Sequence, residues 1–152
     1  MPGFVEWSTM YARYRVLATK IKAQFWVSST YTRPLNVGIY MSPVALPGVT
    51  QADFQRLVRG NPNGRTSELI PGYRTTTVKM YRGMGKLSGD PVSYRTDQDY
   101  TAPINANPAK IFYGYVFASG VKMGEFPPAG VVYIKTEVTC YIRFYERDNE
   151  LS

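Results

Sequence analysis

Residues 131–145 read Val-Val-Tyr-Ile-Lys-Thr-Glu-Val-Thr-Cys-Tyr-Ile-Arg-Phe-Tyr, and this stretch decides the fold class. Its residues alternate in type, and one face carries Val132, Ile134, Thr136, Val138, Cys140, Ile142 and Phe144. A period of two over this length indicates a long strand with one buried face. Because no Gly or Pro interrupts the run, we expect a central strand, with Cys140 as a small buried residue of the core.

The rest of the chain supplies the strands that we expect to pair with this one. The same alternation predicts strands at 17–27, 35–41, 73–82 and 110–118. Aromatic residues spaced three and four apart predict a short helix or turn at 5–14, and a pattern similar to a capping box at Thr50 and Asp53 predicts another helix, ending at Gly60. The Gly- and Pro-rich segments are expected to be loops, with one short strand near 92–94; they are 28–34, 83–108 and 119–130.

The overall composition is that of one globular domain. Of the 152 residues, 44% are hydrophobic and 19% are charged, which allows a hydrophobic core. Long strands without an alternation of strands and helices predict an all-β fold, an antiparallel sandwich or barrel with one or two short helices in its loops. We expect a single domain spanning residues 1–152.

The charge of the chain favours a polyanionic partner. The formal net charge is +7, and residues 1–95 carry 13 Lys and Arg against 4 Asp and Glu. Near the N-terminus, basic residues are interleaved with aromatic ones, an arrangement suited to neutralising phosphates and stacking on unpaired bases. The nucleic-acid-binding candidates are Arg13, Arg15, Lys20, Lys22 and Trp26. An alternative, equally compatible with the sequence, is a solvated strand face whose lysines cover apolar neighbours.

The residues needed for enzymatic chemistry are largely missing from the sequence. There is no histidine, and Cys140 is the one cysteine, so the usual general base and the usual metal clusters are lacking. Asp97 and Asp99 have no calcium-loop spacing, and no phosphate-binding glycine motif precedes a helix. We therefore expect no enzyme, no cofactor and no metal. No run approaches the roughly 20 apolar residues of a membrane span, so membrane insertion is not expected.

Several strings, taken in order, point to a known family. Residues 11–26 read Tyr-Ala-Arg-Tyr-Arg-Val-Leu-Ala-Thr-Lys-Ile-Lys-Ala-Gln-Phe-Trp, an aromatic-x-x-Tyr-Arg-Val turn that leads into a Lys-x-Lys strand. The string Trp7-Ser-Thr-Met-Tyr11 precedes it, and the aromatic strand 110–118 and the long strand 132–146 follow it. In order and spacing, these segments resemble the capsid proteins of circovirus-like viruses with circular single-stranded DNA genomes.

The resemblance implies a single jelly roll, with two four-stranded antiparallel sheets packed face to face. It also implies self-assembly into an icosahedral shell that encloses circular single-stranded DNA without reading its sequence. Such a protein belongs to the virion, is assembled in the nucleus or cytoplasm of the host cell, and can meet a host receptor. The candidate subunit contacts are Trp7, Tyr11, Arg82, Tyr94, Tyr100 and Phe126.

The sequence departs from the family pattern at its beginning. Circovirus-like capsid proteins start with a long Arg- and Lys-rich arm followed by the first strand of the jelly roll, and we expect both to be missing here. Two alternatives to a shell protein follow from the residues. One is a monomeric β-barrel that binds single-stranded nucleic acid, and the other is a cellular jelly-roll module that binds a carbohydrate or a receptor.

Overall fold

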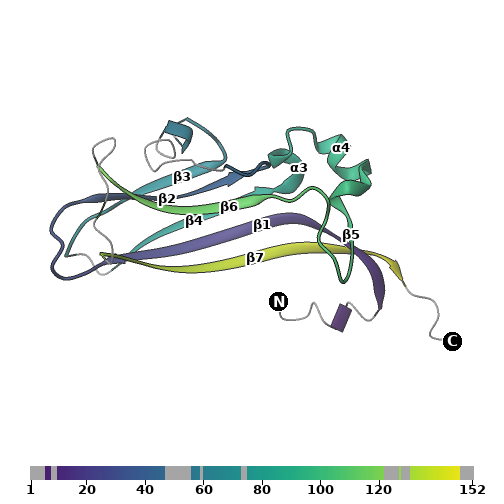
Figure 1. Ribbon diagram of the computed structural model, residues 1–152, viewed down its shortest axis with the longest axis horizontal. Coiled ribbons are helices and arrows are strands. Elements are labelled where there is room, and N and C mark those ends of the chain that lie inside the picture. The colour runs from purple at the N-terminus through teal and green to yellow at the C-terminus, as the bar shows by residue number, and fades with distance from the viewer. Residues whose placement is uncertain are drawn as a thin grey trace. The chain divides into compact units, whose positions relative to one another are not determined.

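The computed structural model describes residues 6–7, 10–46, 56–58, 60–72, 75–121, 127 and 131–147, with side chains up to residue 145 in the last segment. The fold is all-β, with two antiparallel sheets and a few short helices (Figure 1). The predicted class, an all-β sandwich, is confirmed. Among the described residues, no helix combines the length and the apolar character that crossing a bilayer requires.

The chain folds into two compact units. The first, called the helical unit, comprises 1–19, 82–112 and 140–152, and the second, called the sandwich unit, comprises 20–81 and 113–139. Strands β1 (Tyr11–Val27) and β7 (Val132–Arg147) each run through both units.

In the first sheet, β1 pairs with β4 (Thr76–Gly83), β5 (Ala102–Pro103) and β7. The second sheet has the order β3-β2-β6, from strands Gly64–Leu69, Leu35–Ser42 and Tyr113–Gly120. Its antiparallel register places Ile39 of β2 between Arg65 of β3 and Val116 of β6. Strand β2 is therefore the fully paired centre of this sheet.

The core of the sandwich unit follows from the alternation along β1 and β2. The buried side chains of these two strands include Ile21, Ala23, Phe25, Leu35, Val37 and Ile39. A Cβ atom on Gly114 of β6 would lie only 2.8 Å from Cδ1 of Ile21 on β1. The two sheets therefore pack directly on each other at this point, and the small residue permits the close approach.

The other face of β2 and β6 is covered by a second, smaller cluster. Tyr40, Val58 and Phe117 are buried together, and Leu46 and Leu57 pack against them. Residues 56–58 are helical, in the part of the chain where a short helix was expected. The proposed capping residues of that helix, at positions 50 and 53, lie outside the described residues.

Gly38 on β2 leaves no room for a side chain. A Cβ atom there would lie 2.6 Å from the backbone oxygen of Arg65 and 2.6 Å from Cζ of Phe117. Because overpacking forces neighbouring groups apart, we expect Gly38→Ala to lower the free energy of unfolding by about 1–3 kcal/mol. Gly83→Ala, whose added atom meets nothing within 4 Å, is the matched control. Equal urea midpoints for the two variants would contradict this packing.

Three secondary-structure predictions from the sequence were wrong. The segment 11–14, expected as a helix or turn, begins β1 because Arg13 and Tyr14 pair with Pro103 and Ala102 of β5. The segment 83–108, expected as a loop with a strand near 92–94, contains helices α3 (Met84–Leu87) and α4 (Pro91–Thr96). Strand β3 was missed because its sequence, Gly-Arg-Thr-Ser-Glu-Leu, has little apolar alternation.

Two other strands shift slightly from their predicted ranges. Strand β4 begins at Thr76, and positions 73–74 of its predicted range lie outside the described residues. Strand β6 spans Tyr113–Gly120, where 110–118 was expected, while β2 matches its prediction closely.

Strand β7 has the predicted extent but not the predicted position. Of the strands that the structure describes, it pairs only with β1, so it is an edge strand and not the centre of its sheet. The exposed fractions of Ile134 and Val138 are 43% and 58%, so the apolar face is not deeply buried. Cys140 is accordingly half-buried rather than a core residue. Alternation predicts a strand with one apolar and one polar face, but it does not predict which parts of the protein cover either face.

Candidate polyanion-binding pocket

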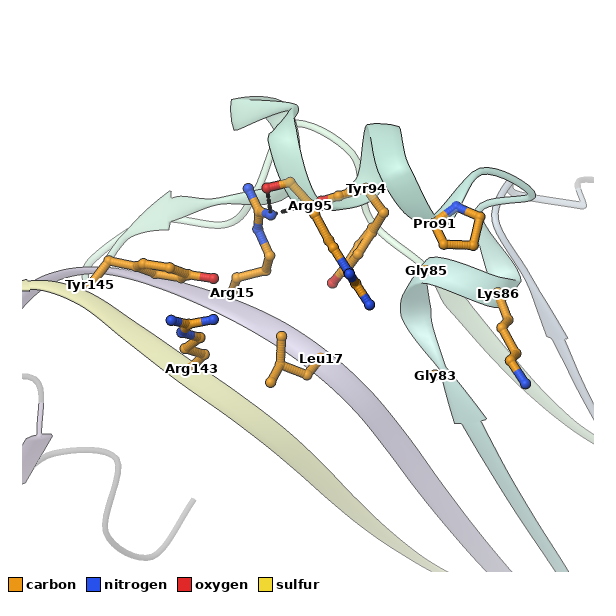
Figure 2. A pocket seen from close by; sticks show the side chains of 10 residues that line it. All are labelled: Arg15, Leu17, Gly83, Gly85, Lys86, Pro91, Tyr94, Arg95, Arg143 and Tyr145. Carbon is orange, nitrogen blue, oxygen red and sulfur yellow. Dashed lines mark hydrogen bonds between the residues drawn. The ribbon is translucent and has the colours of Figure 1, made fainter.

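The helical unit contains a pocket of about 630 Å³ between β1, β7 and the helices α3 and α4 (Figure 2). Its side chains are basic, aromatic or small, and none of the lining residues is acidic. The lining comprises Arg15, Leu17, Gly83, Gly85, Lys86, Pro91, Tyr94, Arg95, Arg143 and Tyr145. Four cations in one concavity make a positive site of the size of a small ligand.

Helix α4 carries three of the lining residues, Pro91, Tyr94 and Arg95, and its start is well defined. The Asp90 side chain accepts hydrogen bonds from the backbone N–H groups of Val92 (2.9 Å) and Ser93 (3.2 Å), and Pro91 occupies the first turn. These are the features of a stable helix N-terminus. The hydrogen bonds, with the Ser93 hydroxyl first among them, hold the pKa of Asp90 below its usual value. The cap therefore fixes where Tyr94 and Arg95 enter the pocket.

Arg15 ties β1 to the other end of α4. Its Nη1 donates to the carbonyl oxygen of Tyr94 at 2.7 Å and to that of Arg95, and its Nη2 donates to the carbonyl of Asp97 at 2.9 Å. Figure 2 shows the guanidinium group against this end of the helix. Arg15 is only 5% exposed. A buried cation on the last carbonyls of a helix complements their negative partial charge, so Arg15 holds the pocket together from within.

Tyr94 is also an internal residue. It is 4% exposed, and its hydroxyl donates to the carbonyl of Val16 on β1. Its ring lies 4.6 Å from that of Tyr100 and 6.0 Å from that of Phe112, measured between centroids. Burial raises the pKa of Tyr94 to about 12, although the charge of Arg15 opposes this shift. Tyr94 was expected at a subunit contact, but this burial assigns it a role inside the chain.

The remaining cations of the pocket are open to solvent. Lys86, Arg95 and Arg143 are exposed, and no carboxylate of the described residues forms an ion pair with them. The Arg143 guanidinium lies 5.2 Å from the centroid of the Tyr145 ring, within cation–π range. Arginine binds phosphate through paired N–H groups, and a tyrosine ring can stack on a base. The pocket therefore suits a phosphate-containing ligand.

Two acidic residues of the same unit, Asp97 and Asp99, share a basic partner. Lys110 Nζ lies 2.6 Å from Asp97 and 3.4 Å from Asp99. The hydrogen bond from Lys110 lowers the pKa of Asp97. These carboxylates thus sit in a local ion-pair cluster. Within the described part of the chain, no group of three metal-ligating side chains comes together.

Of the five nucleic-acid-binding candidates, only Arg15 lines the pocket. Arg13 lies in the helical unit, where its Nη2 donates to the Thr101 hydroxyl at 3.2 Å. Lys20, Lys22 and Trp26 belong to the sandwich unit.

The three candidates in the sandwich unit differ in what they contact. Lys22 Nζ lies 3.1 Å from Glu137, and this hydrogen bond lowers the pKa of Glu137. The ring of Trp26 stacks on that of Tyr133 at 5.9 Å, while Lys20 is exposed. A phosphate contact by these residues stays a prediction.

The structure describes five of the six subunit-contact candidates. Trp7 is 47% exposed, and its ring lies 6.1 Å from that of Tyr11. Arg82 and Tyr100 are half-buried, and Phe126 lies outside the described residues. For Trp7, Tyr11, Arg82 and Tyr100 a contact with a neighbouring copy stays a prediction.

The exposed cations of the pocket were missed from the sequence. Lys86 and Arg95 belong to a segment expected to be a loop, and Arg143 comes from the strand at the far end of the chain. Only the pairing of β7 with β1 and the folding of 84–96 into helices bring them together. The one available signal was Asp90-Pro91, a helix start that argued against a loop. No known family model matches this chain, and no curated protein matches it either.

Proposed function

We propose that this chain is the subunit of a self-assembling icosahedral capsid that encloses circular single-stranded DNA, and that the pocket in its helical unit contacts the DNA backbone. The protein is then a component of the virion. Its sandwich unit serves as the shell scaffold, and its role is structural rather than enzymatic. The proposal starts from the resemblance of the sequence to circovirus-like capsid proteins and draws support from strand order and charge.

The strand order is the observation that carries the proposal. In an eight-stranded jelly roll, the third strand pairs with the sixth and the fourth with the fifth, and the seventh and eighth strands flank these pairs. Here β1 pairs with β4 and β2 with β3, while β6 flanks β2 and β7 flanks β1. The six strands thus correspond in order and pairing to the third to the eighth strands of a jelly roll. Strands β6 and β7 correspond to the seventh and the eighth, which lie next to the second and the first strand of a complete jelly roll.

The charge distribution supports the DNA contact. A packaged genome is recognised through its phosphates, because a shell must accept any sequence. Lys86, Arg95 and Arg143 supply exposed positive charge in one concavity, and Tyr145 adds an aromatic face to it. This combination neutralises phosphate groups and tolerates every base.

Assembly tests the proposal directly. Sedimentation velocity of the purified chain, at low and high salt and with or without circular single-stranded DNA, is expected to reveal large closed particles. Negative-stain electron microscopy of the same samples is expected to show uniform shells. A chain that stays monomeric under every condition contradicts the capsid proposal. If such a monomer still binds single-stranded DNA, the alternative of a nucleic-acid-binding β-barrel replaces it.

A further inference from the structure

The pocket of the helical unit has an apolar surface among its cations. Leu17 on β1 is 43% exposed, and Pro91 at the start of α4 belongs to the same lining. In the view of Figure 2, the Leu17 side chain stands between those of Arg143 and Arg95. A phosphate group alone would leave this apolar surface in contact with water. A ligand that fills the pocket therefore needs an apolar face as well as negative charge.

The Tyr145 ring connects the buried and the exposed cations of the pocket. Its centroid lies 5.8 Å from Cζ of Arg15 and 5.2 Å from Cζ of Arg143. Arg15 is buried and bonded to the end of α4, whereas Arg143 is exposed. Cation–π attraction to the ring therefore favours one position of the Arg143 side chain. A planar guanidinium group held in this way offers a face on which a nucleobase can stack.

The lining side chains offer few partners to the edges of a base or to the hydroxyls of a sugar. None of these described side chains carries a carboxylate, an amide or an aliphatic hydroxyl group. Among them, only the tyrosines have an acceptor, and the Tyr94 hydroxyl already donates to the Val16 carbonyl. Base discrimination requires hydrogen bonds to the base edges, whereas stacking accepts every base. The lining therefore fits the face of any base, together with an adjacent phosphate.

We propose that the pocket holds one unpaired nucleotide of a single strand, including its base. The base packs on Leu17 and stacks on the Arg143 guanidinium group, while Lys86 and Arg95 bind the adjacent phosphate. A cavity of about 630 Å³ lies within the range of sites for small ligands. The assignment rests on the proposed contact of this pocket with DNA, and it adds that a base enters the pocket beside the phosphate.

A strand without bases separates this inference from a phosphate contact alone. An oligothymidylate and an abasic strand of equal length carry the same number of phosphates, so they present the same charge to the cations. In fluorescence anisotropy at moderate salt, the oligothymidylate is expected to bind about tenfold more tightly than the abasic strand. Equal affinities overturn the entry of a base and leave the phosphate contact standing. No measurable binding of either strand overturns the proposed DNA contact together with this inference.

A variant of the apolar surface locates the effect in the pocket. Leu17→Thr keeps a residue suited to a strand and changes no charge. It is expected to weaken oligothymidylate binding about fivefold, and to leave both the abasic strand and the salt dependence unaffected. Ile111→Thr is the matched control, because Ile111 belongs to the same unit, is also 43% exposed and does not line the pocket. Equal losses for the two strands, or in the two variants, overturn the inference.

Free nucleotides provide a second readout on the unaltered chain. Thymidine monophosphate carries a base and a phosphate, whereas thymidine and inorganic phosphate each carry one of these parts. Thymidine monophosphate is expected to displace a labelled single strand at a concentration about ten times lower than either part, because both sets of contacts form together. Displacement by inorganic phosphate at the same concentration as by thymidine monophosphate overturns the inference, since the base then contributes nothing.

Discussion

Reversing the three exposed charges of the pocket is expected to weaken single-stranded DNA binding about a hundredfold or more. The variant carries Lys86→Glu, Arg95→Glu and Arg143→Glu, and each change removes one phosphate contact. Because each phosphate contact on a single strand contributes about 0.7 to the slope of log affinity against log salt, the size of this slope is expected to fall by about two. Fluorescence anisotropy with a labelled single strand, measured across a salt series, gives both quantities.

A matched control separates the pocket from the overall charge of the protein. Arg56→Glu, Arg65→Glu and Lys79→Glu make the same change in net charge at exposed positions of the sandwich unit. This control is expected to keep most of its DNA affinity, because none of its three positions lines the pocket. Equal losses in the two triple variants would mean that net charge alone drives binding and that the pocket is not the site.

Replacing Arg15 by methionine is expected to destabilise the helical unit strongly. Hydrogen bonds to charged groups contribute about 1.5–3 kcal/mol each, and Arg15 makes three at the end of α4. Since these bonds share one side chain, we expect a loss of about 4 kcal/mol in the free energy of unfolding, measured by urea denaturation. The carbonyls of Tyr94 and Arg95 lose their buried donor, so hydrogen exchange of the α4 amides is expected to accelerate.

The conservative variant distinguishes geometry from charge at this position. Arg15→Lys keeps the positive charge, but one ammonium group cannot span carbonyls that a planar guanidinium bridges. It is therefore expected to recover only part of the stability. Full stability in Arg15→Met would contradict the assignment of Arg15 to the internal support of the pocket and return it to the set of candidate phosphate ligands.

The sequence predicts where individual strands lie better than it predicts which strands pair with each other. Alternation predicted β2 and β7 closely, because a period of two depends on the chain alone. It could not predict that, among the described strands, β7 pairs only with β1, since pairing depends on which strands lie next to it in the fold. It also could not find β3, whose polar residues are held in a strand by their hydrogen bonds to β2.

The pocket could not be predicted from the sequence, because its residues come together only through contacts between distant parts of the chain. Arg15 was identified from its basic and aromatic neighbours, but the carbonyls that it binds lie about 80 positions away in the chain. Arg143 joins the site only through the pairing of β7 with β1. Contacts between residues so distant in sequence leave no pattern in a single sequence. The helix start at Asp90-Pro91 was readable, and applying it would have placed Arg95 on a helix.

Nuclease protection tests the central claim most directly. Particles assembled with circular single-stranded DNA are treated with a single-strand nuclease, purified by size, and their DNA is extracted and quantified. A closed capsid predicts intact circular DNA in the particle fraction, at a constant mass ratio to protein and across a range of nuclease concentrations. Complete digestion of the DNA, with the protein sedimenting as monomers or small oligomers, would contradict the assignment of this chain as a capsid subunit.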